Sequence, residues 1–297
     1  MPLTKIHSSF SALNLKYDWP LSQLSTLGTG GMAEIFVQPE SVPQLQEILG
    51  NVKNCPVYIL GGGSNVIIPD GRIPGLVISS RSLNASKWIS PFMAEIESGF
   101  PLPLLVKTLR EKNTGGLEFA SGIPGTLGGA LYGNAGAGGH GVCEYADSVK
   151  AVDRSGEILT FRRGDFSYGY RRCTLRGAVI VSAVMSFAEG VSWNEQAYSD
   201  FMSKRRKQPL EFRSAGCTFK NPEGDSAGRL LDECGCKGMR AGDAEVSEKH
   251  ANFIINRGHA SSSDVLELVR MCADRVYERT GARLVPEIMT LSPCFSV

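Results

Sequence analysis

The sequence has few histidines and no long apolar run, and each shortage argues against a class of function. Its four histidines, His7, His140, His250 and His259, do not have the spacing of metal ligands. No stretch offers the roughly 20 consecutive apolar residues of a membrane-spanning helix, and the N-terminal segment has no signal-peptide core. We therefore expect no metal site, no membrane partner and a cytoplasmic location.

An excess of charge of one sign is also missing. The 31 Lys and Arg residues nearly balance the 30 Asp and Glu residues, so the formal net charge is +1 at pH 7. Nucleic acid is therefore not an expected partner. The run Lys-Arg-Arg-Lys at 204–207 is more often a solvated helix face, and a phosphate site is the alternative for it.

The cysteines give no sign of a disulfide framework or a metal centre. Only Cys234 and Cys236 are close in sequence, and neither a C-x-x-C pair nor a histidine cluster accompanies them. The others are scattered through a chain without a secretory signal, so we expect free thiols. The eight cysteines are Cys55, Cys143, Cys173, Cys217, Cys234, Cys236, Cys272 and Cys294.

Glycine, in contrast, is abundant and is concentrated in two loops. The stretch 122–139 opens with Gly-Ile-Pro-Gly-Thr-Leu-Gly-Gly-Ala and holds no charged residue, and Gly-Gly-Gly-Ser-Asn at 61–65 follows the apolar run 57–60. Glycine adopts positive φ and has no Cβ, so such loops bring backbone N–H groups close to a ligand, usually a pyrophosphate. Two such loops predict one ligand held from two sides.

Two common nucleotide fingerprints do not explain these loops. The sequence contains no G-x-x-x-x-G-K-[ST] segment, which disfavours a P-loop. The glycines Gly136, Gly138 and Gly141 match G-x-G-x-x-G, but they follow a glycine-rich loop instead of a strand. We interpret that match as chance and expect a fold other than a Rossmann unit.

Regular elements are predicted on both sides of the loops. Ser41 and Gln44 form a capping box with Pro43 in the first turn, and this helix joins two strands in a βαβ-like unit whose glycine loop ends the second strand. Predicted strands are 35–37, 57–60, 76–78, 93–97 and 178–185, with a hairpin of 149–153 and 157–161. Predicted helices are 102–109, 193–207 and 263 or 264 to 281.

Six motifs then carry a resemblance, and they cover nearly the whole chain, from about residue 24 to about 291. They are Leu-Gly-Thr-Gly-Gly-Met-Ala (27–33), Leu-Gly-Gly-Gly-Ser-Asn (60–65), the stretch 122–130, Tyr170-Arg171, Gly-Cys-Thr-Phe-Lys-Asn-Pro (216–222) and Pro286-Glu287. In this order they resemble the UDP-N-acetylenolpyruvoylglucosamine reductase (MurB) family. The chain has no long insertion between 177 and 193, and in this respect it resembles the family's compact subtype, which lacks a tyrosine loop.

The resemblance implies an α+β flavoprotein of the vanillyl-alcohol-oxidase (PCMH) type. FAD would lie between two subdomains, 1–80 and 81–198, and a substrate domain would span 199–297. The implied FAD contacts are in and around the two glycine loops. They are Gly61, Gly62, Gly63, Ser64, Asn65, Ser121, Gly122, Ile123, Pro124, Gly125, Thr126, Gly128, Gly129, Asn134, Ala135 and Gly136.

Three residues are implied to be catalytic. Arg171 matches the family's arginine, whose planar fork suits a carboxylate and its enolate; spacing alone does not separate it from Arg172. Glu287 matches a carboxylate that assists the proton donor. The family normally has a serine as that donor, and here the position holds Cys217. A thiol is a stronger acid than a hydroxyl, so Cys217 suits the role of proton donor. The alternative is that Cys217 is a small buried thiol that takes no part in the reaction.

Four further residues are implied to meet the substrate. Lys220 and Asn221 precede Pro222 and suit a phosphate or a sugar, although Asn-Pro also favours a plain turn. His250 and Asn252 match a stretch that lines the substrate domain, and direct contact and a supporting role are equally open for them.

The function implied by the resemblance is an FAD-dependent reductase that uses NADPH. Its substrate would be UDP-N-acetylglucosamine enolpyruvate and its product UDP-N-acetylmuramate, a peptidoglycan precursor. Two alternatives are an FAD-dependent oxidase of the same fold with another small substrate, and a nucleotide-binding regulator without catalysis. We expect a monomer.

Overall fold

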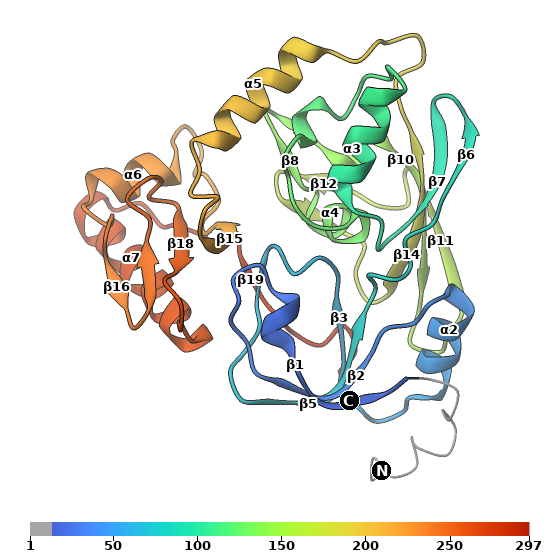
Figure 1. The fold of residues 1–297 in the computed structure, drawn as a ribbon, viewed down its shortest axis with the longest axis horizontal. Helices are drawn as coiled ribbons and strands as arrows, with labels where there is room; N and C mark the ends of the chain where they lie inside the picture. Colours follow the sequence, from blue (N-terminus) through green and yellow to red (C-terminus); the bar gives the residue numbers. More distant parts are fainter. Residues whose placement is uncertain (1–13, 297) are drawn as a thin grey trace.

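The first part of the chain builds a four-stranded sheet (Figure 1). The computed structural model describes residues 14–296. Strand β5 lies between β2 and β3 and is parallel to both, and β1 is antiparallel to β2. The strands, in spatial order, are β1 (Lys16–Pro20), β2 (Met32–Val37), β5 (Arg72–Ser79) and β3 (Val57–Leu60), with the short helix η2 (Leu21–Leu24) after β1.

Helix α2 (Val42–Asn51) joins β2 to β3, which confirms the predicted strand–helix–strand unit. The Ser41 side chain caps the helix by accepting a hydrogen bond from the Gln44 N–H. The Gln44 side chain accepts from the Glu40 N–H instead of the Ser41 N–H, so only half of the predicted capping box forms. Strand β3 ends at the glycine loop, as expected.

The middle of the chain forms a five-stranded antiparallel sheet. Its central strand β14 pairs with β10 on one side and β7 on the other. The predicted hairpin is confirmed as β10 and β11. The strands, in spatial order, are β11 (Ile158–Arg162), β10 (Ala146–Val152), β14 (Val179–Ser186), β7 (Met93–Glu97) and β6 (Ser86–Ser90).

A helical layer packs on this sheet and carries the second glycine stretch. Part of that stretch, which we expected to be loop, is a helix, α4 (Leu127–Gly133). Its buried residues Leu127, Ala130 and Leu131 share one face and join the core beneath them. The other elements of this part are α3 (Leu102–Glu111), η3 (Glu118–Ala120), β8 (Gly136–Ala137), β9 (His140–Gly141), η4 (Val142–Tyr145), β12 (Tyr168–Gly169) and β13 (Arg172–Cys173).

Helix α5 (Glu195–Arg206) leads from this part to a smaller lobe with its own sheet and core (Figure 1). Helix α7 (Ser262–Thr280) begins at the Ser261 cap, slightly earlier than predicted, and ends before Gly281 as expected. Its predicted apolar face is buried. The remaining elements are α6 (Ala227–Glu233) and the sheet β15 (Arg213–Cys217), β18 (Phe253–Asn256), β17 (Ala244–Val246) and β16 (Arg240–Ala241).

After α7 the chain returns to the first sheet region. Strand β19 (Met289–Thr290) pairs in parallel with β4 (Val66–Ile67), which follows the first glycine loop. The N-terminus of α7 is tied to the same region, because the Asp70 carboxylate accepts hydrogen bonds from the Ser262 and Ser263 N–H groups. The C-terminal lobe is therefore anchored beside the first glycine loop.

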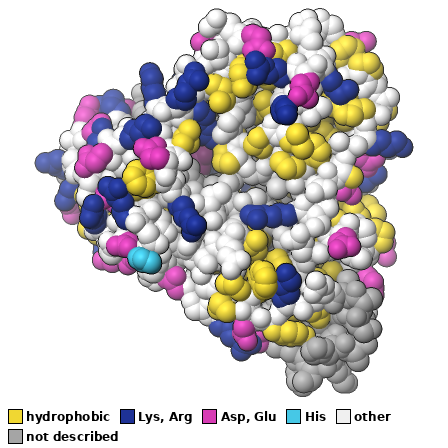
Figure 2. Space-filling view, viewed as in Figure 1, with side chains coloured by type: hydrophobic (Ala, Val, Ile, Leu, Met, Phe, Trp, Pro, Cys, Tyr) yellow, Lys and Arg dark blue, Asp and Glu magenta, His cyan; other side chains and the backbone are white. Residues whose placement is uncertain are grey.

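Charged side chains are mixed on the face shown in Figure 2, where Lys and Arg alternate with Asp and Glu over the C-terminal lobe. Among the described residues, no helix is both long and apolar enough to cross a membrane. All eight cysteines are free thiols.

Candidate active site

The two glycine loops contact each other. A Cβ built on Gly62 would lie 2.5 Å from the Cα of Gly125, so the backbones approach as closely as glycine allows. The Ser64 hydroxyl donates a hydrogen bond to the Pro124 carbonyl at 3.2 Å. The two glycine loops therefore lie side by side, and the shared ligand stays a prediction.

An arginine that sequence reasoning missed shapes the first loop. Arg81 donates from Nε to the Gly61 carbonyl at 3.1 Å and from one terminal nitrogen to the Gly62 carbonyl at 3.0 Å. The same nitrogen donates to the Leu24 carbonyl at 2.8 Å. Burial lowers the pKa of Arg81. Nothing in the local sequence marks this residue, because its partners lie 19 to 57 positions away.

A buried hydroxyl without a partner faces the space between the loops. Thr126 Oγ1 has no hydrogen-bond partner among the described residues. It lies 2.7 Å from a Cβ built on Gly61 and 3.7 Å from one built on Gly129. Gly129 is exposed on α4, and its Cβ would meet no other atom outside the helix within 4 Å. An unpaired hydroxyl beside an open glycine face fits a polar ligand, and these residues fit FAD.

Other glycines of the predicted set are explained by packing within the protein. A Cβ on Gly63 would lie 1.9 Å from the Leu24 carbonyl oxygen, and one on Gly136 would lie 1.8 Å from the His140 carbonyl oxygen. A Cβ on Gly128 would meet Ser98. These positions require glycine whether or not a ligand is bound.

The remaining predicted cofactor residues lie in the same region. The buried Ser121 hydroxyl donates to the Glu118 carbonyl, and Ile123 packs against the core beneath α4, as does Ala135. Gly122 lies against Arg205. Asn65 donates from Nδ2 to the Glu287 carbonyl at 3.2 Å, which links the first loop to a predicted catalytic residue.

Arg171 and Glu287 form an ion pair although 116 positions separate them. Arg171 Nε donates to Glu287 Oε1 at 2.5 Å, and the two side chains are 23% and 15% exposed. Arg171 sits in the turn between β12 and β13 with a φ of 52°, a left-handed conformation that is uncommon for a non-glycine residue. Arg172, the alternative, is exposed. The structure thus brings Arg171, and not its neighbour, to Glu287.

Cys217 ends β15 beside this pair. The register shifts between Ser214 and Cys217, so a bulge redirects the end of the strand. Burial and, to a smaller extent, the Glu287 carboxylate raise the pKa of the Cys217 thiol to about 11, although the charges of Arg171 and Arg205 oppose the rise. The group is therefore a protonated thiol surrounded by one acid and two cations.

Arg205 is a second cation that sequence reasoning did not single out. Of the run 204–207, the other three side chains are exposed, as expected for a solvated face, whereas Arg205 turns inward. It donates to the Gly122 carbonyl at 2.7 Å and to Gln208 Oε1 at 2.6 Å, and burial lowers its pKa. Arg205 therefore connects the second glycine loop with the Cys217 region.

The four predicted substrate residues divide into two groups. Lys220 Nζ donates to the Arg171 carbonyl at 3.5 Å, and the Asn221 N–H donates to the Tyr170 hydroxyl at 3.2 Å, so both lie at the Arg171 turn. The buried Asn252 amide bonds to the N–H and carbonyl of Phe219. His250 Nδ1 accepts from the Asn252 N–H, and burial lowers the His250 pKa. His250 and Asn252 thus support the backbone that precedes Lys220.

Comparison with known proteins decides the family. Residues 33–162 match an FAD binding domain, and residues 208–291 match the C-terminal domain of UDP-N-acetylenolpyruvoylglucosamine reductase. The reductase of that name from Clostridium tetani is 37% identical over 295 residues, 97% of this chain and 96% of the relative. The chain belongs to the UDP-N-acetylenolpyruvoylglucosamine reductase family. The relative from Clostridioides difficile is 39% identical over 284 residues, 94% of this chain and 93% of its own.

A solved structure of the family agrees. The crystal structure of the reductase from Thermus caldophilus has a TM-score of 0.80 and 32% identity, and the match covers 94% of this chain and 98% of that chain. The predicted family and its α+β FAD-binding fold are therefore confirmed. Between residues 177 and 193, where we expected no long insertion, this reductase-family chain has strand β14 and short connections.

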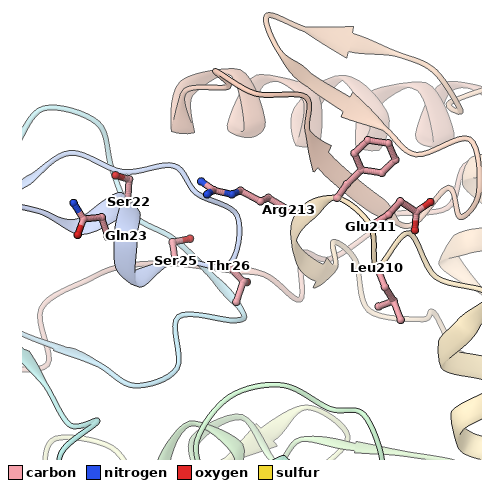
Figure 3. A pocket seen from close by; sticks show the side chains of 8 residues that line it. Ser22, Gln23, Ser25, Thr26, Leu210, Glu211 and Arg213 are labelled. Carbon is pink, nitrogen blue, oxygen red and sulfur yellow. The ribbon is translucent and has the colours of Figure 1, made fainter.

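A pocket with a volume of about 620 Å³ opens beside the first glycine loop of this reductase-family chain (Figure 3). Arg213 points across it toward the segment of Ser22 and Ser25, and its side chain lies against Gly28. The Thr26 hydroxyl bonds to the Ser214 carbonyl at 2.7 Å and joins the two walls. The full lining is Ser22, Gln23, Ser25, Thr26, Leu210, Glu211, Phe212 and Arg213.

Proposed function

We propose that Arg171, Cys217 and Glu287 form the site at which the enolpyruvyl double bond of UDP-N-acetylglucosamine enolpyruvate is reduced to give UDP-N-acetylmuramate. The chain is an FAD-dependent, NADPH-using reductase of peptidoglycan precursor synthesis. The observation that carries the roles is the meeting of these three residues, from segments far apart in the sequence, beside the glycine loops. An oxidase or a regulator would not explain a match to the reductase over both lobes.

FAD, when bound, supplies the hydride that reduces an electron-poor carbon. The protein must then stabilise the charge that develops on the substrate carboxylate and deliver a proton to the adjacent carbon. Arg171 carries out the first task, because its planar guanidinium binds a carboxylate through two parallel hydrogen bonds. Glu287 orients that guanidinium through its bond to Nε.

Cys217 delivers the proton. Its raised pKa keeps the thiol protonated at neutral pH, and the nearby cations Arg171 and Arg205 favour the thiolate that remains after transfer. Glu287 also faces the thiol, and its negative charge favours reprotonation of the thiolate from solvent between turnovers. Lys220 and Asn221, at the Arg171 turn, are placed to meet the substrate's sugar or phosphates.

The division of the chain follows from the same proposal. Residues 1–80 and 81–198 would hold FAD between them, and 199–297 would bind the nucleotide sugar. We further propose that the protein acts in the cytoplasm and as a monomer, in keeping with a nucleotide-sugar substrate and a site that one chain completes.

Anaerobic half-reactions test the proposal. NADPH should bleach the absorbance of the oxidised flavin, and the enolpyruvyl substrate should then restore it with formation of UDP-N-acetylmuramate. Bleaching without restoration by this substrate would contradict the proposed function while leaving the flavoprotein assignment intact.

Arg171→Lys should slow substrate-dependent reoxidation by about ten- to a hundredfold, because a point charge replaces a bidentate fork. Flavin reduction by NADPH should stay within about twofold of the parent. Stopped-flow absorbance measures both rates. Arg172→Lys is the matched control, since its exposed side chain lies one residue away, and equal losses in the two variants would show that Arg171 has no special role.

The reoxidation rate should be constant from neutral pH to about pH 10 and should fall as pH rises through about 11. The proton donor must be protonated to act, and burial together with the Glu287 charge raises the Cys217 pKa to about 11. Rapid pH jumps in a stopped-flow instrument give the profile. A fall near pH 8.5, the reference pKa of a thiol, would contradict the buried environment of Cys217.

A further inference from the structure

The turn that presents Arg171 has a backbone that needs outside support. Tyr170 and Arg171 connect β12 to β13 in a two-residue turn, and the φ of Arg171 is 52°. An arginine adopts this left-handed region only where neighbouring contacts impose it. The position of the guanidinium therefore depends on whatever fixes the turn.

Contacts from the C-terminal lobe hold one side of the turn. Lys220 Nζ donates to the Arg171 carbonyl, the Asn221 N–H donates to the Tyr170 hydroxyl, and Glu287 bonds to the guanidinium. In our proposal each of these contacts involves a residue that meets the substrate, namely Lys220, Asn221 or Arg171. They are consequently expected to change when substrate binds.

The contact on the other side comes from Asn134, at the end of the cofactor helix α4. Asn134 Nδ2 donates to the Gly169 carbonyl at 2.8 Å, one residue before the turn. Its Oδ1 accepts from the Cys143 N–H at 3.1 Å, so both ends of the amide are engaged. The residue is only 6% exposed and itself has a left-handed backbone, with a φ of 45°.

The surrounding backbone is shaped to admit this side chain. A Cβ built on Gly141 would lie 2.3 Å from Asn134 Oδ1. Gly141 has a φ of −141°, a conformation open to any residue, so its own backbone does not require glycine. The space that Gly141 leaves open is occupied by the Asn134 amide.

We infer that Asn134 is a positioning residue for the reduction: it ties the C-terminal end of α4 to the strand that leads into the Arg171 turn. The helix that begins at the cofactor loop thereby sets the place of the guanidinium before substrate arrives. In this assignment, which rests on the proposed function, the Asn134 side chain acts through Arg171 and does not touch the reacting atoms. It holds protein backbone in place of the FAD contact that the resemblance implied for it.

Asn134→Asp tests the inference with little change in shape. The carboxylate keeps an acceptor for the Cys143 N–H, tolerates the left-handed backbone and loses the donor to Gly169. We expect flavin content and reduction by NADPH within about twofold of the parent. The maximal reoxidation rate should fall about tenfold or more, with a smaller change in the half-saturating substrate concentration. The control is Asn113→Asp, at an exposed left-handed asparagine after α3.

Gly141→Ala reaches the same contact by another route. The new methyl group displaces the Asn134 amide without straining residue 141, so the loss of reoxidation rate should match that of Asn134→Asp. A double variant separates positioning from general damage. In the Arg171→Lys background, Asn134→Asp should slow reoxidation by less than about twofold, because the two residues act as one unit.

Three results would overturn the inference. The first is a parent-like reoxidation rate in both Asn134→Asp and Gly141→Ala while the parent is active. The second is an equal slowing by Asn134→Asp in the parent and in the Arg171→Lys background. The third is a loss of flavin that added FAD does not restore. A parent protein that is not reoxidised by the enolpyruvyl substrate would instead contradict the proposed function.

Discussion

Cys217→Ala is expected to slow reoxidation of the reduced flavin by the enolpyruvyl substrate by about 10²- to 10⁴-fold, the usual contribution of a positioned general acid. Alanine has no proton to give, and the neighbouring groups do not replace it. Arg171 and Glu287 are paired with each other, and Arg205 is engaged with the Gly122 carbonyl and the Gln208 side chain. Flavin reduction by NADPH should be unchanged, because that half-reaction needs no proton at this carbon.

Cys217→Ser separates chemistry from packing. A hydroxyl occupies the same position on the side chain and also donates a proton, so this variant should retain substantial reoxidation activity. It should also lack the fall near pH 11 or show it at higher pH. Stopped-flow absorbance and product analysis measure the outcome.

Cys294→Ala is the matched control for the loss of a partly buried thiol. Cys294 lies beside Val57 on the first sheet, away from Arg171 and Glu287, and burial raises its pKa as well. Its variant should reduce and reoxidise at the parent rates. Normal substrate reduction by Cys217→Ala would end the assignment of Cys217 as proton donor.

Elements with a clear period were predictable from the sequence. The apolar face of α7 repeats at helical spacing over 19 residues, and strand β3 is an apolar run that ends at glycines. Helix α4 was not predictable in the same way, because glycine is common within it and disfavours helix. The helix is indicated only by the helical spacing of Leu127, Ala130 and Leu131, and that these three residues are buried together is known only from the structure.

The site was predictable only through ordered motifs. They drew attention to Arg171, Cys217 and Glu287, but no local pattern indicates that Arg171 pairs with Glu287 across 116 positions. The supporting residues were missed for the same reason. Arg81 and Arg205 act through backbone carbonyls of distant loops, and such contacts leave no spacing in the sequence.

The structure also changes which glycine best tests the cofactor site. From the sequence alone, Gly62 and Gly129 are equally good candidates for a glycine that contacts FAD. A side chain at Gly62 would collide with Gly125, so a variant there would force the loops apart even without a ligand. Loss of flavin from such a variant therefore would not identify what lies in the space.

Gly129→Val should abolish FAD binding, because the new side chain would occupy space that FAD needs without clashing with the protein itself. A Cβ at this exposed position meets only Thr126 Oγ1 within 4 Å outside the helix, at 3.7 Å, and valine disfavours helix no more than glycine does. The FAD-free variant should therefore unfold at the same temperature as the FAD-free parent, whereas the purified protein should be colourless and added FAD should not raise that temperature. Gly133→Val is the control, because this glycine is in the same helix and its Cβ would meet no atom within 4 Å. If Gly129→Val stays fully yellow while Gly133→Val is also unaffected, FAD does not lie against this face of α4, and the unpaired Thr126 hydroxyl must serve another partner.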